Sequence, residues 1–193
     1  MSKLLIYFFI LQLKIIDFIL SVFKKKISNK VSLEIENRSY VNKKILNKSI
    51  KFFSPNHITD WRLNTLFSKE PNTISWIDNF KGDKIIFWDI GGNIGIYSIY
   101  AAIKHGKKIE IYTFEPSSNN LRVLCRNISI NNLEEQIKIV QIPLYDGKPK
   151  ILKMKESKFI EGSAINTFSK EFNHTGNRFN SNNSYHIVGS NID

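Results

Sequence analysis

The 193-residue sequence predicts an α/β protein built on a doubly wound parallel sheet. An apolar run at residues 85–88 ends in Asp89 and is followed by a glycine-rich turn, which is typical of a buried parallel strand that leads into a helix. Two more strand-like segments follow at 109–114 and 136–142, and a helix-length stretch precedes each of them. Alternating strands and helices at this spacing favour parallel strands joined by right-handed crossovers.

Composition narrows the class of protein. Hydrophobic residues make up 42% and charged residues 23% of the chain, within the range of folded globular domains. The one cysteine, Cys125, excludes an intramolecular disulfide and a cysteine-rich zinc site. A net charge of +11 favours anionic partners. However, lysine, isoleucine and asparagine are all abundant, as AT-rich codon usage would produce, so the charge is weak evidence of function.

The first predicted domain, residues 1–27, is an apolar or amphipathic helix followed by a basic cluster at 24–26. The apolar run at 4–23 has about the length that crosses a bilayer. Lys14 and Asp17 interrupt it, and a charge at mid-membrane costs roughly 2.5–3.5 kcal/mol. Three alternatives remain: a helix at the membrane interface, a helix packed on its own domain or a partner chain, and a true membrane anchor.

The remaining elements follow in order. Residues 28–82 form a lead-in segment with a strand at 49–53, a helix at 60–67 and a helix that has Pro71 in its first turn and ends by Gly82. The third domain, residues 83–193, holds the predicted parallel sheet. Its other segments are helices at 96–104 and 117–130, a strand at 150–155, a polar loop at 173–183 and an apolar stretch at 185–192.

The glycine-rich turn, residues 89–95, lies where chemistry is expected. It follows the carboxyl end of the first strand and opens a helix, so its backbone N–H groups can approach an anionic ligand. Glu115 ends the second strand, 26 residues after Asp89, and its carboxylate can accept hydrogen bonds from both hydroxyls of a ribose. The layout therefore predicts a cofactor that contains adenosine. Its predicted binding residues are Asp89, Gly91, Gly92, Asn93, Gly95, Glu115 and Leu144.

The motif discriminates between cofactors. A nicotinamide fingerprint fails because Asn93 stands where the second glycine belongs, and no Gly-Lys-Ser/Thr ending of a Walker loop exists. The pattern Asp-x-Gly-x-Asn-x-Gly resembles the first motif of Rossmann-fold methyltransferases that bind S-adenosylmethionine. In those proteins the loop wraps the amino-acid end of the cofactor, and the acid of the second strand holds its ribose. The alternative is an ordinary strand-to-helix turn that binds no ligand.

More of the sequence resembles the FkbM-type methyltransferases. The matching segments are 87–95, 114–117 with 119–121, 126–128 with Asn131, and upstream 65–71 with 76–77. The resemblance covers roughly residues 60–193. It implies a Rossmann-like sheet, S-adenosylmethionine as cofactor, and O-methylation of a hydroxyl on a sugar, glycolipid or other small metabolite. The substrate oxygen attacks the methyl group in line, so the protein mainly positions the partners and no metal is required. A catalytic base is not identifiable from the sequence.

The sequence departs from the family at two places. Gly92 replaces a more common alanine, which we expect to be neutral. The family's later Lys-Ile-Asp-Val-Glu-Gly-like segment, which forms the strand beside the first one, does not follow residues 184–193. The domain is therefore expected to be incomplete at its C-terminus and to need more chain for catalysis. The alternative function is a membrane-associated cofactor-binding or scaffold module that has lost its catalytic half.

Partners and side chains of other classes are weaker candidates. No proline follows Asn or Asp, so the signature of many base-modifying methyltransferases is missing and no specific nucleic-acid partner is expected. We expect a cytoplasmic protein, and contact of residues 1–27 with the inner face of the membrane is one of the alternatives given above. Among histidines, only those in the C-terminal tail are candidates for a catalytic role. These histidines are His174 and His186. Cys125 is expected to be buried in a helix interface, and the tryptophans are expected in the core: Trp61, Trp76 and Trp88.

Overall fold

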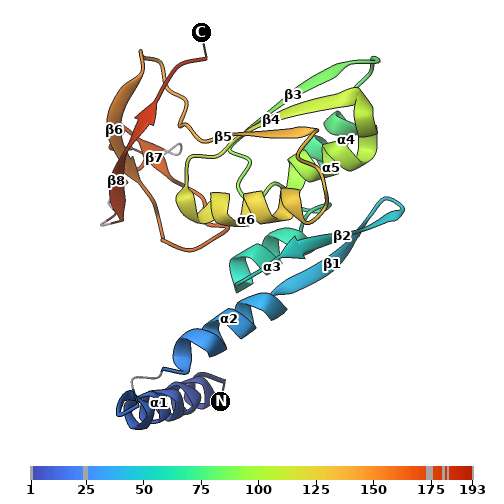
Figure 1. The fold of residues 1–193 in the computed structure, drawn as a ribbon. Helices are drawn as coiled ribbons and strands as arrows, with labels where there is room; N and C mark the ends of the chain where they lie inside the picture. Colours follow the sequence, from blue (N-terminus) through green and yellow to red (C-terminus); the bar gives the residue numbers. More distant parts are fainter. Residues whose placement is uncertain (1, 24–25, 173–175, 180, 182, 193) are drawn as a thin grey trace. The chain divides into compact units, whose positions relative to one another are not determined.

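The computed structural model describes residues 2–23, 26–172, 176–179, 181 and 183–192 (Figure 1). The chain forms two compact units, Met1–Tyr40 and Val41–Asp193. The polar loop predicted at 173–183 falls largely outside the described residues, and so does His174. The three domains predicted from the sequence, with boundaries after residues 27 and 82, stay predictions.

The first unit contains two helices, α1 (Ser2–Ser21) and α2 (Ser28–Arg38). The predicted apolar helix is therefore present. Asp17, which interrupts the apolar run of this helix, makes its contacts beyond the helix. Asp17 Oδ1 accepts hydrogen bonds from the backbone N–H groups of Ile27 at 2.6 Å and Ser28 at 3.2 Å, where α2 begins. The carboxylate thus serves as a capping group for a helix ten residues further along the chain.

The second unit opens with a two-stranded sheet, β1 (Tyr40–Ile45) and β2 (Lys48–Phe53), and the short helices α3 (His57–Asn64) and α4 (Pro71–Asp78). Helix α3 begins three residues earlier than predicted because Asn56 caps it, accepting from the backbone N–H groups of Ile58 and Thr59. Pro71 lies in the first turn of α4, as predicted, but that helix ends at Asp78, four residues before Gly82.

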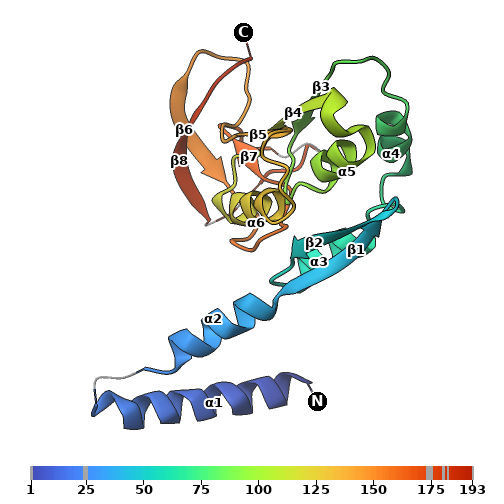
Figure 2. The same cartoon turned by 45° about the vertical axis from the view of Figure 1, so that its right-hand side comes forward.

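The central sheet has three parallel strands in the order β3-β4-β5, with β3 at Ile85–Ile90, β4 at Ile109–Phe114 and β5 at Ile137–Val140. Helices α5 (Ile96–His105) and α6 (Ser118–Ser129) are the crossovers, and both lie on the same face of the sheet (Figures 1 and 2). This topology confirms the predicted α/β class with a parallel sheet. It also brings the carboxyl ends of β3 and β4 side by side.

The two faces of β3 differ in burial. Phe87 and Asp89 point to the helices and are buried. On the other face, Ile86, Trp88 and Ile90 are 60%, 45% and 61% exposed. Apolar side chains therefore remain in contact with solvent along one face of this strand, within the part of the chain that the structure describes. The Trp88 ring is consequently not a core residue.

A second sheet follows, with β6 (Lys150–Lys155) between β7 (Thr167–Phe168) and β8 (Ser184–Gly189). Both pairings of β6 are antiparallel. The strand predicted at 150–155 is thus confirmed, and the apolar stretch predicted at 185–192 supplies β8. This small sheet matters because its side chains help to wall the larger cavity described below.

Asn127 ties helix α6 to strand β2. Its side-chain oxygen accepts from the backbone N–H of Phe53 at 2.7 Å, and its amide donates to the carbonyl of Ile94 at 2.9 Å. The Asn127 side chain is fully buried. One turn later, Asn131 bonds both the N–H and the carbonyl of Lys51 at the exposed end of the same strand. The asparagines at this end of α6 therefore hold strand β2 in place through its backbone groups.

Several predicted side-chain environments are wrong. Cys125, expected to pack inside a helix interface, is exposed. Trp61 and Trp76, expected in the core, are 49% and 58% exposed. Both helices that carry these tryptophans are short, with eight residues each, and bury only two side chains apiece, so most of their surface faces water.

Candidate functional site

The glycine-rich turn between β3 and α5 is tied to the end of β4. The backbone N–H groups of Gly91 and Gly92 both donate to the carbonyl of Phe114, at 2.8 and 3.0 Å. Gly91 has a φ of 84° and Gly95 a φ of 85°, a left-handed conformation that glycine adopts without strain. The N–H groups of Gly91 and Gly92 are thus hydrogen-bonded within the protein. The turn therefore allows a ligand to approach its backbone closely but does not offer these two N–H groups as free donors.

Gly92 is required by packing, which overturns the expectation that it is neutral. A Cβ atom at this position would lie 2.0 Å from the Oγ1 atom of Thr113 and 3.4 Å from its Cβ. Thr113 is fully buried on β4, and its hydroxyl has no hydrogen-bond partner among the described residues. The turn therefore crosses the neighbouring strand too closely for any other side chain.

Replacing Gly92 by alanine is expected to destabilise the fold by about 1–3 kcal/mol, because a methyl group would overpack this contact. The double variant Gly92→Ala/Thr113→Ala should recover most of that loss, since only an ordinary contact with the Cβ of residue 113 remains. Urea unfolding of the two single variants and the double variant forms a complete cycle. Additive losses would show that the two positions do not touch.

Glu115 follows β4 and is almost fully buried, with 4% of its surface exposed. Its two carboxylate oxygens accept from two backbone N–H groups, Oε1 from Ser117 and Oε2 from Asn93, both at 2.8 Å. Burial raises the pKa of Glu115, and these two hydrogen bonds partly oppose the rise. The carboxylate thus joins the glycine-rich turn to the start of α6.

Asp89, the last polar residue of β3, is also buried. Its Oδ2 atom accepts from the hydroxyl of Ser98 in α5 at 2.5 Å. Burial raises the pKa of Asp89, against the effect of this hydrogen bond. The side chain therefore ties the end of β3 to the first turn of α5.

The larger cavity at the strand ends has a volume of about 640 Å³, a size typical of small-molecule sites. Glu115 and Asn120 lie on its wall, and Asp146 and Lys170 add two further charges. The rest of the wall is mostly apolar and includes Leu144, which the sequence predicts as a cofactor-binding residue. The apolar lining residues are Ile90, Phe114, Pro116, Ile142, Pro143, Leu144, Met154, Ala164, Ile165, Phe168 and Phe172.

A second cavity of about 410 Å³ lies on the other side of the glycine-rich turn. Its wall holds Arg62 from α3, Glu70 from the start of α4, Asp89 and Gly92. Burial lowers the pKa of Arg62, while the ion pair with Lys69 lowers the pKa of Glu70. The cavity therefore presents a cation and carboxylates to the same space.

Asn93 stands on the wall that the two cavities share. It has a φ of 54°, and its amide donates to the carbonyl of Ser163 at 2.8 Å. Asn120 holds the same segment, because its amide donates to Ser163 and its oxygen accepts from Gly162. The side-chain oxygen of Asn93 is buried and has no partner among the described residues, so an unused acceptor lies between the cavities.

Six of the seven predicted cofactor residues line one cavity or the other. The exception is Gly95, whose added Cβ would meet Leu124 at 2.6 Å, so this glycine serves helix packing. The larger cavity is lined by Glu115 and Leu144, the smaller by Asp89 and Gly92, and both by Gly91 and Asn93. His57, His105 and His186 line neither cavity.

Two groups of lining residues are not among the sequence predictions. Arg62 and Glu70 come from the lead-in segment. The resemblance of that segment to the family was the one sign in the sequence that it contributes to the site. Residues 163–168 close the larger cavity, and nothing in their sequence indicates this position. Among the described residues, no group of three or more His, Cys, Asp or Glu is arranged to hold a metal ion.

No family model matches the chain, and no curated protein is significantly similar to it. Several solved methyltransferases share part of the fold at low identity. The S-adenosylmethionine-dependent methyltransferase from Agrobacterium tumefaciens is 15% identical over 54% of this chain and 33% of its own, with a TM-score of 0.41. TYW2 from P. horikoshii, solved with MeSAdo, is 14% identical over 57% of this chain and 39% of its own, with a TM-score of 0.40.

TYW2 from M. jannaschii, solved with AdoMet, is 17% identical over 53% of this chain and 42% of its own, with a TM-score of 0.38. The alignments thus cover less than half of each of these proteins. Because the scores lie below 0.5, the fold assignment rests on the strand order and crossovers described above.

Proposed function

We propose that the chain is an S-adenosylmethionine-dependent methyltransferase whose cofactor binds at the carboxyl ends of β3 and β4. The observation that carries the proposal is Glu115, a buried carboxylate on the wall of an otherwise largely apolar cavity. Each of its oxygens accepts one backbone hydrogen bond, and Asn120 adds a side-chain hydrogen bond, so the carboxylate retains acceptor capacity for a ribose hydroxyl. Leu144 and Pro143 supply the apolar wall that an adenine needs.

The smaller cavity suits the amino-acid end of the same cofactor. That end is a zwitterion, so it needs a cation for its carboxylate and an anion or acceptor for its ammonium group. Arg62 meets the first need, and Glu70 with the unpaired oxygen of Asn93 meets the second. The glycine-rich turn lies between the two cavities, where a side chain would obstruct a ligand that extends from one to the other.

When bound, S-adenosylmethionine supplies an electrophilic methyl group. The chain's own residues bind the two ends of the cofactor, orient it across the turn and exclude water from the buried Glu115. The acceptor that we propose is a hydroxyl on a sugar, glycolipid or other small metabolite, by resemblance to the FkbM-type enzymes. We propose no base for the acceptor hydroxyl.

Isothermal titration separates the two halves of this assignment. S-adenosylmethionine and 5′-methylthioadenosine share the adenosine group, but only the first carries the amino-acid end. Arg62→Met should weaken the binding of S-adenosylmethionine about tenfold, the cost of one charged hydrogen bond, and leave 5′-methylthioadenosine unaffected. Arg122→Met, which changes an exposed arginine outside both cavities, is the matched control. Folded chain that binds neither ligand would overturn the proposal.

Binding of S-adenosylmethionine is expected to depend on the ionisation of Glu115. The pKa of this carboxyl is raised by burial, with the nearby Glu156 adding to the rise. The ionised form, which accepts best from ribose hydroxyls, is therefore lost as the pH falls through a value above the ordinary 4.5 of glutamate. Affinity should weaken over that range in titrations from neutral to mildly acidic pH. Glu115→Gln should bind weakly at every pH and lose the dependence, and a wild-type profile in the variant would contradict the assignment.

The exposed face of β3 favours a second candidate function. Ile86, Trp88 and Ile90 leave apolar surface beside the proposed site. In this alternative the chain binds the cofactor but transfers no methyl group until another segment or partner covers that face. Tight binding of S-adenosylmethionine without methyl transfer to any hydroxyl acceptor supports it, whereas turnover by the chain alone excludes it.

A further inference from the structure

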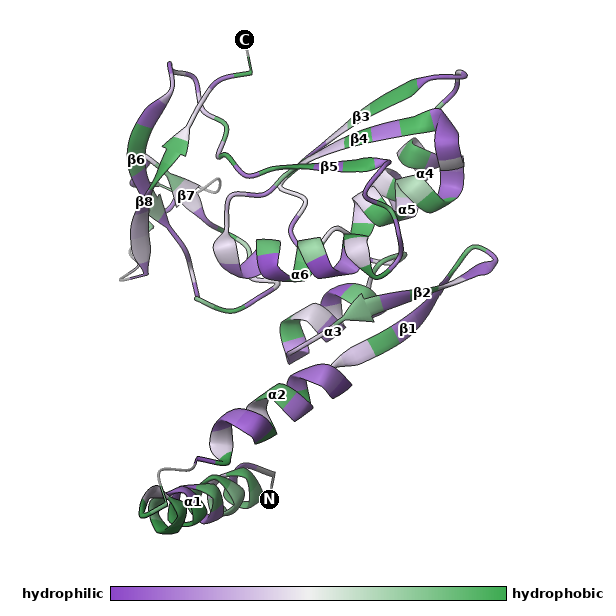
Figure 3. Cartoon of the chain, viewed as in Figure 1, coloured by the Kyte–Doolittle hydropathy of each residue, from purple (hydrophilic) through white to green (hydrophobic). Residues whose placement is uncertain are grey.

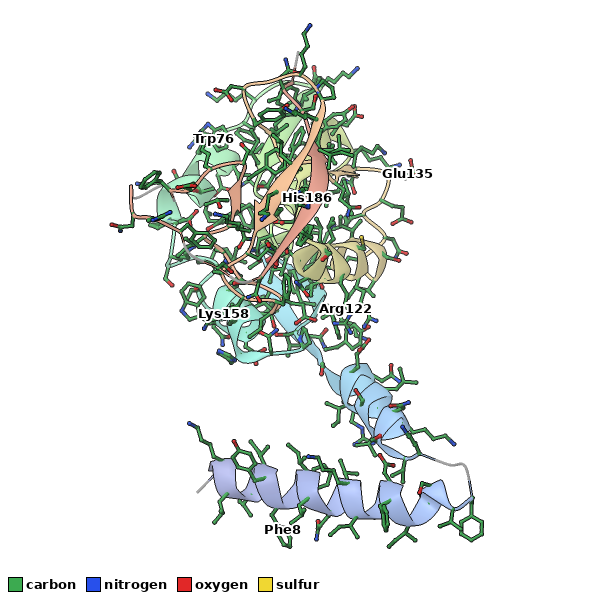
Figure 4. The ribbon with its side chains drawn as sticks, turned by 90° about the vertical axis from the view of Figure 1, so that its left-hand side faces the viewer. Phe8, Trp76, Arg122, Glu135, Lys158 and His186 are labelled. Atoms are coloured by element: carbon green, nitrogen blue, oxygen red, sulfur yellow. The ribbon has the colours of Figure 1, made fainter. Side chains whose placement is uncertain are left out.

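Helix α1 exposes apolar side chains around most of its circumference. The segment Lys3–Ser21 is long and apolar enough to cross a membrane, and none of it is buried. Figure 3 shows the contrast between this helix and the mostly hydrophilic α2, and Figure 4 shows side chains such as Phe8 that project from α1 into open space. Apolar surface of this extent on a soluble monomer marks an interaction site.

Asp17 divides α1 into two sides. Its carboxylate caps the start of α2, so α2 leaves from the Asp17 side of the first helix. At 100° per residue, Lys3 and Lys14 fall within about 60° of Asp17. Phe8 and Ile15 fall about 160–180° away, on the opposite side. The helix therefore has a polar stripe next to α2 and, apart from Gln12 at about 140° from Asp17, a broad apolar surface facing away from it.

This arrangement disfavours a helix that crosses the bilayer. The cap holds the polar helix α2 at the level of Asp17, so the part of α1 free to enter hydrocarbon is residues 4–16. Thirteen helical residues extend about 20 Å, whereas the hydrocarbon core is about 30 Å thick. A helix that lies flat needs no such length, and it keeps both Lys14 and the attached α2 on the water side.

The charges indicate the kind of surface. Lys3, Lys14, Lys26 and Lys30 of this unit are exposed. Asp17, the acid of α1, is engaged by backbone N–H groups and the Ser28 side chain, which lower its pKa and keep it ionised in place. Basic side chains beside an apolar helix face complement a membrane that contains anionic lipids.

We propose that α1 lies flat in the interface of an anionic membrane, with Phe8 and Ile15 in the acyl region and Asp17, Lys14 and α2 facing water. The inference is independent of the proposed methyl transfer. This placement of α1 tethers the chain to a membrane surface, where an acceptor carried on a lipid would be within reach.

Two isoleucines of α1 provide a matched test. Ile6 and Ile15 are 57% and 51% exposed, but Ile6 lies within about 20° of Asp17 and Ile15 about 160° from it. The full chain is sedimented with vesicles of equal parts phosphatidylcholine and phosphatidylglycerol. Ile15→Ser should weaken binding about tenfold and Ile6→Ser much less, because only Ile15 enters the acyl region. Lys14→Gln should weaken it about fivefold, and added salt should weaken it further.

Other environments of α1 would give different results in these experiments. Equal losses for Ile6→Ser and Ile15→Ser, together with retention in the membrane after alkaline carbonate washing, would show a spanning helix and overturn the proposal. Binding to pure phosphatidylcholine as tight as to the mixture would overturn the role of the lysines. An oligomer in solution that Ile15→Ser dissolves, with no vesicle binding, would show instead that α1 packs on a second copy of the chain.

Discussion

Replacing Glu115 by glutamine is expected to weaken the binding of S-adenosylmethionine by about ten- to a hundredfold. Glutamine has nearly the same size, but it carries no charge and its amide nitrogen accepts no hydrogen bond. Hydrogen bonds to a charged acceptor contribute about 1.5–3 kcal/mol, and the ribose would lose at least one of them. Titration calorimetry on folded variant measures the change directly.

The same substitution should also lower stability, because Glu115 has a structural role as well. The backbone N–H groups of Asn93 and Ser117 both donate to its carboxylate, and glutamine leaves one of them without an acceptor. An unsatisfied buried donor costs about 1–3 kcal/mol, partly offset here by removal of a buried charge. A loss of stability is expected because this carboxylate is buried rather than open to solvent at the strand end.

Glu110→Gln is the matched control on the same strand. Its carboxylate accepts from the hydroxyl of Tyr112 and lines neither of the two cavities of the site. This variant should bind the cofactor as the wild type does. If Glu115→Gln melts at a lower temperature but binds with unchanged affinity, Glu115 only caps the turn and α6, and the ribose assignment fails.

Replacing Asn127 by leucine is expected to destabilise the fold by about 2–5 kcal/mol, the largest stability effect that we predict. The change leaves the N–H of Phe53 and the carbonyl of Ile94 without partners in a fully buried place. For a chain of this length the melting temperature should fall by about 2–4 °C per kcal/mol. Urea unfolding should show a lower midpoint with an unchanged slope.

Asn131→Leu is the control for that prediction. Asn131 makes the same kind of contacts, with the N–H and the carbonyl of Lys51, but at an exposed position where water can replace them. Its loss should be below about 1 kcal/mol. Equal losses of unfolding free energy in the two variants would mean that the burial of the Asn127 hydrogen bonds adds nothing to their contribution.

Strong local patterns predicted the central sheet. The apolar run at 85–88 and the alternation at 109–114 each gave a strand within one or two residues of its observed ends. By contrast, α2 was missed: it buries none of its residues, and its apolar residues Val31, Leu33 and Ile35 alternate as they would in a strand. Its start depends on Asp17, a contact across ten residues of sequence that no local pattern encodes.

The candidate site was predictable where backbone geometry determines residue type. The turn at 89–95 needs glycines for left-handed φ values and for the close approach of Gly92 to Thr113. The hydrogen bond between Glu115 and the Asn93 backbone, and the positions of Arg62 and Glu70, were not predictable. They arise because segments remote in sequence meet at the strand ends, and neither periodicity nor spacing reports such contacts.

The most direct test of the central claim is a crystal structure of the chain with S-adenosylhomocysteine. The account predicts that the ribose hydroxyls bond to the Glu115 carboxylate, that the adenine lies against Leu144, and that the amino-acid end extends past the glycine-rich turn toward Arg62. A ligand bound elsewhere, or an adenosine group with no contact to Glu115, would contradict it.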